Sequence, residues 1–202
     1  MNSPHNKHGS RRPGSAPHGP ASRLSRGFTL VELLVVMAVM AILAVVAMPS
    51  MARIVDSTRL TSFSNGFLAA MYHARSEAIK RNGPVALCKS ANGRTCATSG
   101  GWEQGWIVFH DPNNNGAADA GEPIVHHTQA LPAGFKLSGN QNVASYISFT
   151  ASGRTRMASG AFQAGTLTLC KADGTEIGAR QIVINNAGRA RVNKLSPGMA
   201  CG

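Results

Sequence analysis

An apolar segment near the N-terminus constrains the fold of this chain more than any other feature. It runs from Phe28 to Met48, 21 residues with a single charge, Glu32. As a helix, the segment would extend roughly 31 Å at about 1.5 Å per residue, which matches the bilayer's apolar thickness of about 30 Å. A carboxylate at that depth would cost about 2.5 to 3.5 kcal/mol without a partner. The segment therefore predicts a membrane-spanning helix whose acid has a specific role.

The residues around Glu32 resemble a known processing signal. Gly27 and Phe28 precede it, and Pro49 follows the apolar segment. This pattern resembles the class III signal of the type IV pilin superfamily, which implies cleavage between Gly27 and Phe28 by prepilin peptidase and N-methylation of the new N-terminus. Cleavage would create an α-amine at Phe28 that neutralises Glu32, within one chain or between packed neighbours. We therefore expect Glu32 to act in assembly with other pilins or pseudopilins.

Two plainer interpretations of the apolar segment stay open. A secretory signal peptide usually has an apolar stretch of about 7 to 15 residues and a small-x-small cleavage site. This segment is longer, contains a glutamate and has no clean site of that kind at residues 45–47. An unprocessed membrane anchor fits the length but leaves Glu32 unexplained.

Residues 1–27 predict a cytoplasmic leader. They are rich in Pro, Gly, Ser and His and carry basic residues without an acid. Such a composition is typical of disorder, and the positive flank of a membrane span stays inside the cell. The chain after Met48 would then be periplasmic. We expect a single-pass inner-membrane protein that later enters a filament.

The remaining sequence predicts a second helical segment and then a β domain. Over residues 49–82, apolar side chains recur at intervals of three or four, which indicates an amphipathic helix that ends at Asn82-Gly83-Pro84. Residues 83–202 contain short alternating runs between Gly, Asn, Pro and Ser, which are typical of antiparallel strands. The expected class is α+β, with one long N-terminal helix, membrane half plus amphipathic half, packed on a small antiparallel β domain. The apolar stripe of the second helical segment comprises Leu60, Phe63, Phe67, Met71, Ala74 and Ala78, and the predicted strands cover 85–88, 106–109, 124–127, 146–149, 166–170 and 181–184.

A more specific resemblance appears at residues 102–116. The run WEQGWIVF, followed by Asp, Asn and Gly residues, is similar to the GspH/FimT family of minor pilins and pseudopilins, whose members also carry a basic stretch like Gly188-Arg189-Ala190-Arg191. The resemblance implies a type IV pilin-like fold and a structural subunit that is not an enzyme. We expect no catalytic residues, because the sequence contains neither a GxSxG motif nor a phosphate-binding glycine loop.

The basic residues predict a DNA-binding surface. The net charge is +11, and the excess outside the leader lies in the C-terminal third. Arg189 and Arg191, at i and i+2 on an extended chain, would point to one side, and guanidinium groups suit phosphate oxygens. In the FimT branch the matching GRxR stretch is implicated in DNA binding during natural transformation, which implies Arg189 and Arg191 here. Lys194 would assist, and a related stretch with Arg154 and Arg156 would widen the surface.

The expected mode of binding is contact with duplex phosphates without sequence readout. No Phe, Trp or Tyr follows Phe162, so the C-terminal tail cannot supply the stacking platforms that single-strand binders use. A basic strand end that is merely solvated is the plain alternative. Two functions therefore stay open: a DNA-binding minor pilin for DNA uptake, and a purely structural pseudopilin of a type II secretion system.

The cysteines predict disulfides, since the periplasm is oxidising. Four cysteines allow three pairings. We expect Cys88 to pair with Cys96 and Cys170 with Cys201, because each pair brackets a local segment. Metal binding by these residues is disfavoured, because neither CxxC nor HxxxH spacing occurs.

One loop has the spacing of a calcium site. Asp111, Asn113, Asn115, Asp119 and Glu122 fit the pattern in which side-chain oxygens surround the ion. The helices that flank such a loop in an EF-hand are missing, and Asn, Asp and Gly are also common in long hairpin loops. We expect a loop without a ligand and no cofactor, with calcium as the alternative.

Overall fold

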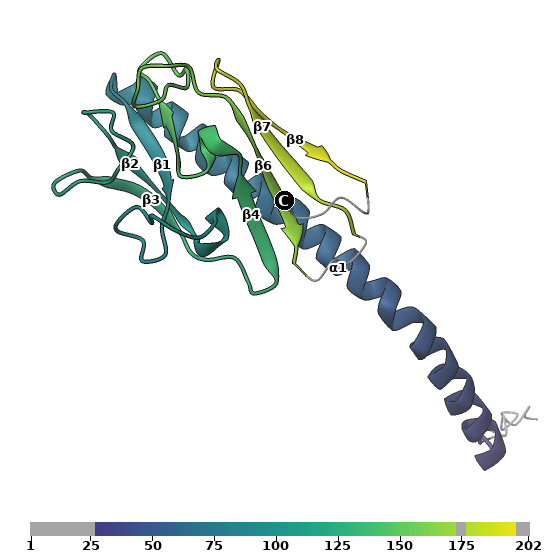
Figure 1. Ribbon diagram of the computed structural model, residues 1–202. Helices are drawn as coiled ribbons and strands as arrows, with labels where there is room; N and C mark the ends of the chain where they lie inside the picture. The colour runs from purple at the N-terminus through teal and green to yellow at the C-terminus, as the bar shows by residue number, and fades with distance from the viewer. Residues whose placement is uncertain (1–26, 173–176, 197–202) are drawn as a thin grey trace, which may run out of the picture. The chain divides into compact units, whose positions relative to one another are not determined.

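The computed structural model describes residues 27–172 and 177–196, which form one long helix and two antiparallel sheets (Figure 1). The helix α1 spans Leu30–Arg81. The strands are β1 Val85–Lys89, β2 Trp106–His110, β3 Ile124–Thr128, β4 Phe135–Gly139, β5 Tyr146–Phe149, β6 Gly165–Lys171, β7 Arg180–Ile184 and β8 Ala190–Lys194. The first sheet has the order β3-β2-β1-β5 and the second β4-β6-β7-β8. The predicted α+β class is confirmed.

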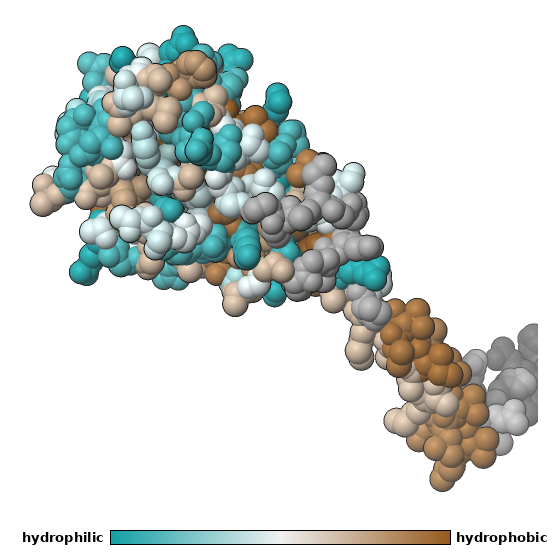
Figure 2. Space-filling view, viewed as in Figure 1, coloured by the Kyte–Doolittle hydropathy of each residue, from teal (hydrophilic) through white to brown (hydrophobic). Residues whose placement is uncertain are grey.

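The helix begins two residues later than Phe28, the start that the sequence predicts. The backbone N–H of Glu32 donates to Thr29 Oγ1 at 3.2 Å, so Thr29 caps the helix and Glu32 occupies the third helical position, as in a capping box. The large apolar side chains from Phe28 to Val55 are 42 to 82% exposed, and Figure 2 shows an apolar surface along this segment. By length and composition, α1 is able to cross a membrane.

The chain divides into two units between Val45 and Val46, and α1 contributes to both. In the second unit α1 ends where the sequence predicts. Asn82 adopts a left-handed conformation with φ 51°, and the N–H of Gly83 donates to the Ala78 carbonyl at 3.2 Å. The left-handed residue turns the chain so that this hydrogen bond satisfies a carbonyl group of the last helical turn.

One hydrophobic core joins α1 to the inner faces of both sheets. The predicted stripe is buried at Leu60, Phe67 and Met71, and Phe63 is partly buried. The Phe67 ring makes edge contacts with Trp102 and Trp106, at centroid distances of 5.2 and 5.0 Å. Facing apolar residues come from β1, β2 and β5 of the first sheet and from β4, β6 and β7 of the second. The helix stripe predicted from the sequence is confirmed.

Two edge strands were not predicted. The stretch that the sequence analysis treats as a C-terminal tail is strand β8, which pairs with β7 through Val183 and Arg191. Ala190 is buried and Val192 packs against the core, whereas Arg191 is exposed. Strand β4 likewise buries alternate residues. The prediction of a tail is wrong because small and aliphatic residues at alternate positions give even this basic stretch one apolar face.

Part of the sequence-based prediction concerns residues outside the described ranges. The predicted leader over residues 1–27 lies outside them except for Gly27, and so does Cys201.

Candidate nucleic-acid interface

The turn between β7 and β8 sets the position of Arg189. Asn185 Oδ1 accepts N–H groups from Ala187 at 3.1 Å and from Arg189 at 3.0 Å. The N–H of Gly188 donates to the Asn185 carbonyl at 3.0 Å, and Gly188 has φ 71°, which favours glycine. This side-chain-supported turn holds the backbone of Arg189 at the start of β8. Strand periodicity then directs Arg191 to the same side.

The second basic stretch lies in the loop that follows β5. The N–H of Thr150 donates to the Arg154 carbonyl at 2.8 Å, and the N–H of Gly153 donates to the Thr150 carbonyl at 2.7 Å. Thr155 is buried, whereas Arg154 and Arg156 on either side of it are exposed. The alternation therefore directs both arginine side chains outward.

The two basic stretches meet at their glycines. The N–H of Thr155 donates to the Asn186 carbonyl at 3.2 Å, and a Cβ added at Gly188 would collide with the carbonyl oxygen of Gly153. Beneath this contact lies Arg75 of α1, whose Nη1 donates to the Gly188 carbonyl at 3.3 Å. A Cβ on Gly153 would lie 2.8 Å from Arg75 Nε. Both stretches need glycine because their backbones approach this closely.

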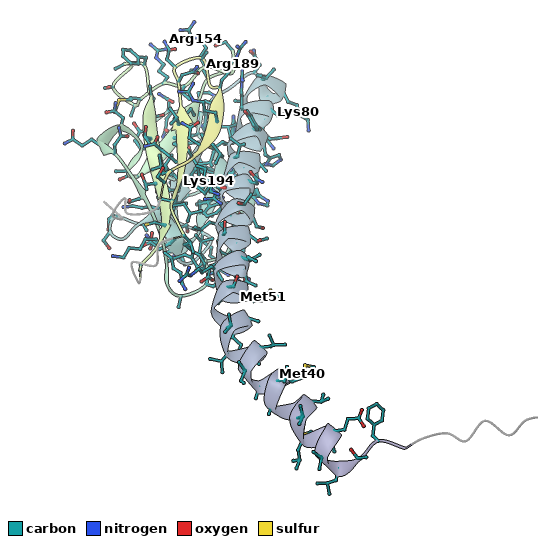
Figure 3. All side chains as sticks on the ribbon, turned by 90° about the vertical axis from the view of Figure 1, so that its right-hand side faces the viewer. Met40, Met51, Lys80, Arg154, Arg189 and Lys194 are labelled. Carbon is teal, nitrogen blue, oxygen red and sulfur yellow. A yellow bond between two sulfur atoms is a disulfide. The ribbon has the colours of Figure 1, made fainter. Side chains whose placement is uncertain are left out.

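The result is one basic surface, the four-arginine surface, formed by Arg154, Arg156, Arg189 and Arg191. All four side chains are exposed, and Figure 3 shows Arg154 and Arg189 at the same end of the β domain. In the described ranges, the ion pairs involve Arg59, Lys80, Arg81 and Lys171 as the bases. No described carboxylate therefore pairs with the four arginines, and their charge is available to a polyanion.

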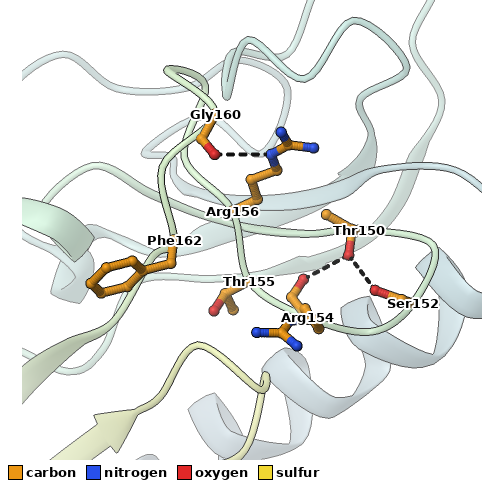
Figure 4. A pocket seen from close by; sticks show the side chains of 7 residues that line it. All are labelled: Thr150, Ser152, Arg154, Thr155, Arg156, Gly160 and Phe162. Atoms are coloured by element: carbon orange, nitrogen blue, oxygen red, sulfur yellow. Dashed lines mark hydrogen bonds between the residues drawn. The ribbon is translucent and has the colours of Figure 1, made fainter.

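Two open hollows accompany this surface. The first, of about 340 Å³, is lined by Arg154, Arg156 and the ring of Phe162, among others (Figure 4). The second, of about 290 Å³, is lined by Arg189 and Arg191. The place of Phe162 at this surface was not predicted, because its separation of six residues from Arg156 does not reveal that the two residues pair across an antiparallel bridge.

Other basic residues of the C-terminal third lie elsewhere. Lys194 is exposed at the far end of β8, on the alternate face from Arg191, and Figure 3 shows it away from Arg154 and Arg189. Lys171 pairs with Asp56 at 2.6 Å. Arg180 is buried and donates to Ser57 and Thr61 of α1, and this burial lowers the pKa of its guanidinium. Lys171 and Arg180 thus fasten the second sheet to α1.

The predicted processing and assembly residues lie together at the start of α1. Gly27, Phe28, Thr29 and Glu32 line an open hollow of about 350 Å³. Phe28 is highly exposed, and a Cβ added at Gly27 would meet no atom within 4 Å. The glycine is therefore not required by local packing. The capping role of Thr29 was not predicted, although the spacing Thr-x-x-Glu could have identified this residue as a cap.

The loop with calcium-site spacing is organised by its own hydrogen bonds. Asp111 is buried, and its carboxylate accepts N–H groups from Asn115 at 3.0 Å and from Gly116 at 2.9 Å. Burial raises the pKa of the Asp111 carboxyl, against the lowering effect of these N–H groups. Asp119 Oδ2 accepts the side-chain amides of Asn113 and Asn115, and Glu122 accepts the N–H of Asp119. This arrangement gives the carboxylates a structural role within the loop, and calcium binding stays the alternative prediction.

A disulfide joins Cys88 of β1 to Cys96 in the following loop, with a Cα–Cα distance of 5.5 Å. Cys88 belongs to a small second cluster on the outer face of the first sheet, together with Ala86, Ile107 and Phe109. The other proposed pair, Cys170 with Cys201, includes a residue outside the described ranges and stays a prediction.

Replacing Cys88 and Cys96 together by serine should lower the free energy of unfolding by about 2.5 kcal/mol, the chain-entropy estimate for so short a loop. Urea denaturation of the full chain, with and without reductant, would measure this difference. Reductant should lower the free energy of unfolding of the wild type by a similar amount. The double variant lacks this disulfide, so reductant should not lower its stability by breaking that bond. Free thiols at Cys88 and Cys96 in protein isolated from oxidising conditions would contradict the bond.

Comparisons with known proteins address the family and the fold. Residues 64–188 match the family model described as type II transport protein GspH, and residues 22–48 match the prokaryotic N-terminal methylation motif. The crystal structure of the type IV minor pilin FimU from Pseudomonas aeruginosa is similar at 18% identity and a TM-score of 0.51, over 66% of this chain and 87% of FimU. The minor pseudopilin EpsH from the type 2 secretion system of Vibrio cholerae is 14% identical, with a TM-score of 0.44 over 70% of this chain and 99% of EpsH. A comparison with curated proteins gives no significant match.

Proposed function

Because this chain belongs to the GspH family of type II transport proteins, and is therefore a minor pilin or pseudopilin subunit, we propose that it binds the phosphate backbone of DNA through its four-arginine surface. The family and the fold neighbour are structural subunits, so the proposal is one of binding without catalysis. The place of such a protein in DNA uptake would be to hold DNA at a filament.

The observation that carries this proposal is the contact between Gly153 and Gly188. It brings two G-R-x-R stretches, 35 residues apart in sequence by their glycine numbers, into one exposed surface over Arg75. A solvated strand end would not require two loops with the same pattern to meet. Planar guanidinium groups bind phosphate oxygens with two parallel hydrogen bonds, which suits a ligand with closely spaced phosphates.

Phosphate contact of this kind carries no sequence readout. The exposed side chains of the four-arginine surface lie on a turn, a loop and an edge strand. Among residues 27–172 and 177–196, none of these four arginines lies on a helix that would enter a major groove. Each neutralised phosphate contributes about −0.9 to the slope of log affinity against log salt. Four contacts therefore predict a slope of about −3.6, with equal affinity for unrelated duplex sequences.

Replacing Arg189 and Arg191 together by alanine should weaken duplex binding uniformly across sequences and change the slope to about −1.8. The measurement is a titration of labelled duplex DNA with the full chain in detergent micelles at several salt concentrations. The fold should be unaffected, because both side chains are exposed.

Two matched variants test the assignment of this surface. Arg94→Ala removes an exposed charge from the loop closed by the Cys88–Cys96 disulfide, and its slope should equal that of wild type. Lys194→Ala should weaken DNA binding less than replacement of either Arg189 or Arg191, because Lys194 lies away from Arg154 and Arg189. Equal binding by wild type and the double arginine variant would refute the assignment of DNA binding to this surface. No binding by either would refute DNA binding and favour a purely structural pseudopilin of a type II secretion system.

The structural part of the role concerns α1. Prepilin peptidase would cleave between Gly27 and Phe28, the apolar segment would hold the subunit in the inner membrane with the β domain in the periplasm, and the same segment would pack with other pilins or pseudopilins in a filament. The methylation motif over residues 22–48 and the exposed apolar side chains of α1 support this assignment. Glu32 would pair with the α-amine of a neighbouring processed Phe28.

A further inference from the structure

We propose that Phe162 is a stacking platform for one unpaired base of DNA, with Arg154 and Arg156 contacting the phosphates next to that base. This inference rests on the proposed DNA-binding function and extends it. The protein would bind DNA with a single-stranded end more tightly than blunt duplex DNA.

The first observation is the exposure of the Phe162 ring. In the described part of the second unit it is 68% exposed, more than any other large apolar side chain there except Met48 at 69% and Val46 at 71%, which belong to the apolar segment. In contrast, six of the described aromatic rings, including Phe67, Phe109 and Phe149, are buried, each at most 5% exposed. An exposed phenylalanine in a hollow between charged residues is suited to a ligand with an apolar face.

The second observation is that the backbone under Phe162 is held rigidly. The neighbouring residue Gln163 is fully buried, and its Oε1 accepts the N–H of Ser148 at 2.9 Å. Its Nε2 donates to the carbonyls of Asn142 at 2.8 Å and Tyr146 at 2.9 Å. These bonds leave Phe162 facing outward at a fixed place, so little ordering would be needed for a ligand to stack on it.

The third observation is the position of the two arginines. Arg156 pairs with Phe162 across an antiparallel bridge, which places their Cβ atoms about 4.5 to 5.5 Å apart. Arg156 is exposed, and its Nε donates to the Gly160 carbonyl at 3.1 Å, a hydrogen bond that does not involve its two terminal nitrogens (Figure 4). Arg154 lines the same hollow. A base on the ring would therefore have guanidinium groups within reach of its flanking phosphates.

These features favour an unpaired base over a duplex or an acidic protein segment at this hollow. In a blunt duplex the flat faces of interior bases are covered by their neighbours, whereas a strand end can place one base on an aromatic ring. Stacking accepts any base, because every base has a π face. An acidic peptide would use the arginines but would gain little from the ring.

The experiment compares three DNA molecules with one full-length protein in detergent micelles. Titrations would use a blunt duplex, the same duplex with a short single-stranded overhang, and the overhang strand alone. We expect the overhang duplex to bind about 5- to 140-fold more tightly than the blunt duplex, the range that stacking of one base supplies. Phe162→Ala should reduce this ratio to near one, and Phe162→Trp should preserve it. Ile124→Ala removes an exposed apolar side chain from β3 and should leave both affinities and their ratio unchanged.

The outcomes separate this inference from the proposed function. The double replacement of Arg189 and Arg191 should weaken binding of both duplexes while the ratio stays above one. If wild type binds both duplexes equally, or if Phe162→Ala retains the preference, the inference is wrong although DNA binding stands. If the Phe162→Ala variant retains the preference for the overhang duplex, but fewer other pilin subunits are recovered with its filaments, then Phe162 contacts a neighbouring subunit instead of DNA. Failure to bind any of the three DNA molecules would overturn both proposals.

Discussion

Replacing Phe67 by alanine should lower the free energy of unfolding of the second unit by about 3 to 5 kcal/mol, the usual loss for a buried phenylalanine. Phe67 is 0% exposed and makes edge contacts with both Trp102 and Trp106. Each such aromatic pair adds about 0.5 to 1.5 kcal/mol beyond the burial of apolar area. The change would also leave a cavity between α1 and the first sheet.

Circular dichroism melts of the full chain would measure this loss. For a unit of this size, about 2 to 4 °C per kcal/mol, we expect the Tm to fall by roughly 6 to 20 °C. Phe63→Ala provides the matched control, because Phe63 is only partly buried and has one aromatic contact, with Phe135 at 5.0 Å. Its loss should be clearly smaller. Equal losses for the two variants would mean that the Phe67 contacts are not central to the core.

The second large effect concerns processing at Gly27. Gly27→Val should leave most of the protein with its leader attached, whereas wild type should begin at Phe28, with the α-amine methylated. Valine would meet no atom within 4 Å at its Cβ, and Gly27 does not have a positive φ. Loss of cleavage would therefore reflect recognition by the peptidase rather than a disturbed fold. Intact mass spectrometry of membrane-extracted protein distinguishes the two forms.

Variants of Glu32 separate cleavage from assembly. Glu32→Ala should insert into the membrane and be cleaved like wild type, but it should be strongly depleted from sheared filaments, because the new α-amine loses its partner. Glu32→Asp keeps the charge and should be incorporated better than Glu32→Ala. Normal incorporation of the alanine variant would show that the neutralising pair is not needed.

Local patterns in the sequence predicted the parts of the fold that depend on local physics. The apolar stripe through Leu60, Phe67 and Met71 is buried as its spacing indicates. The end of α1 at Asn82 follows from a residue that tolerates a left-handed conformation before Gly and Pro. The predicted start of α1 was two residues too early, because Thr29 was not considered as an N-terminal cap.

The missing strands and part of the site depend on contacts between distant segments. Strands β4 and β8 are short edge strands, and their apolar alternation involves only two buried or partly buried residues each. The meeting of Gly153 and Gly188 is set by packing against Arg75, a residue on another element. The position of Phe162 depends on the bonds of the buried Gln163. The spacing of apolar residues along the sequence, which predicts helices and strands, does not indicate contacts between distant segments.

The aromatic packing around Phe67 also gives the protein an intrinsic spectroscopic reporter. The chain has two tryptophans, and both indole rings contact this one phenylalanine of α1. Their emission therefore monitors the docking of α1 on the first sheet without any label. Because both indoles are buried and neither lines the hollows beside the arginines, a shift in emission maximum during a titration would signal a rearranged core rather than an occupied surface.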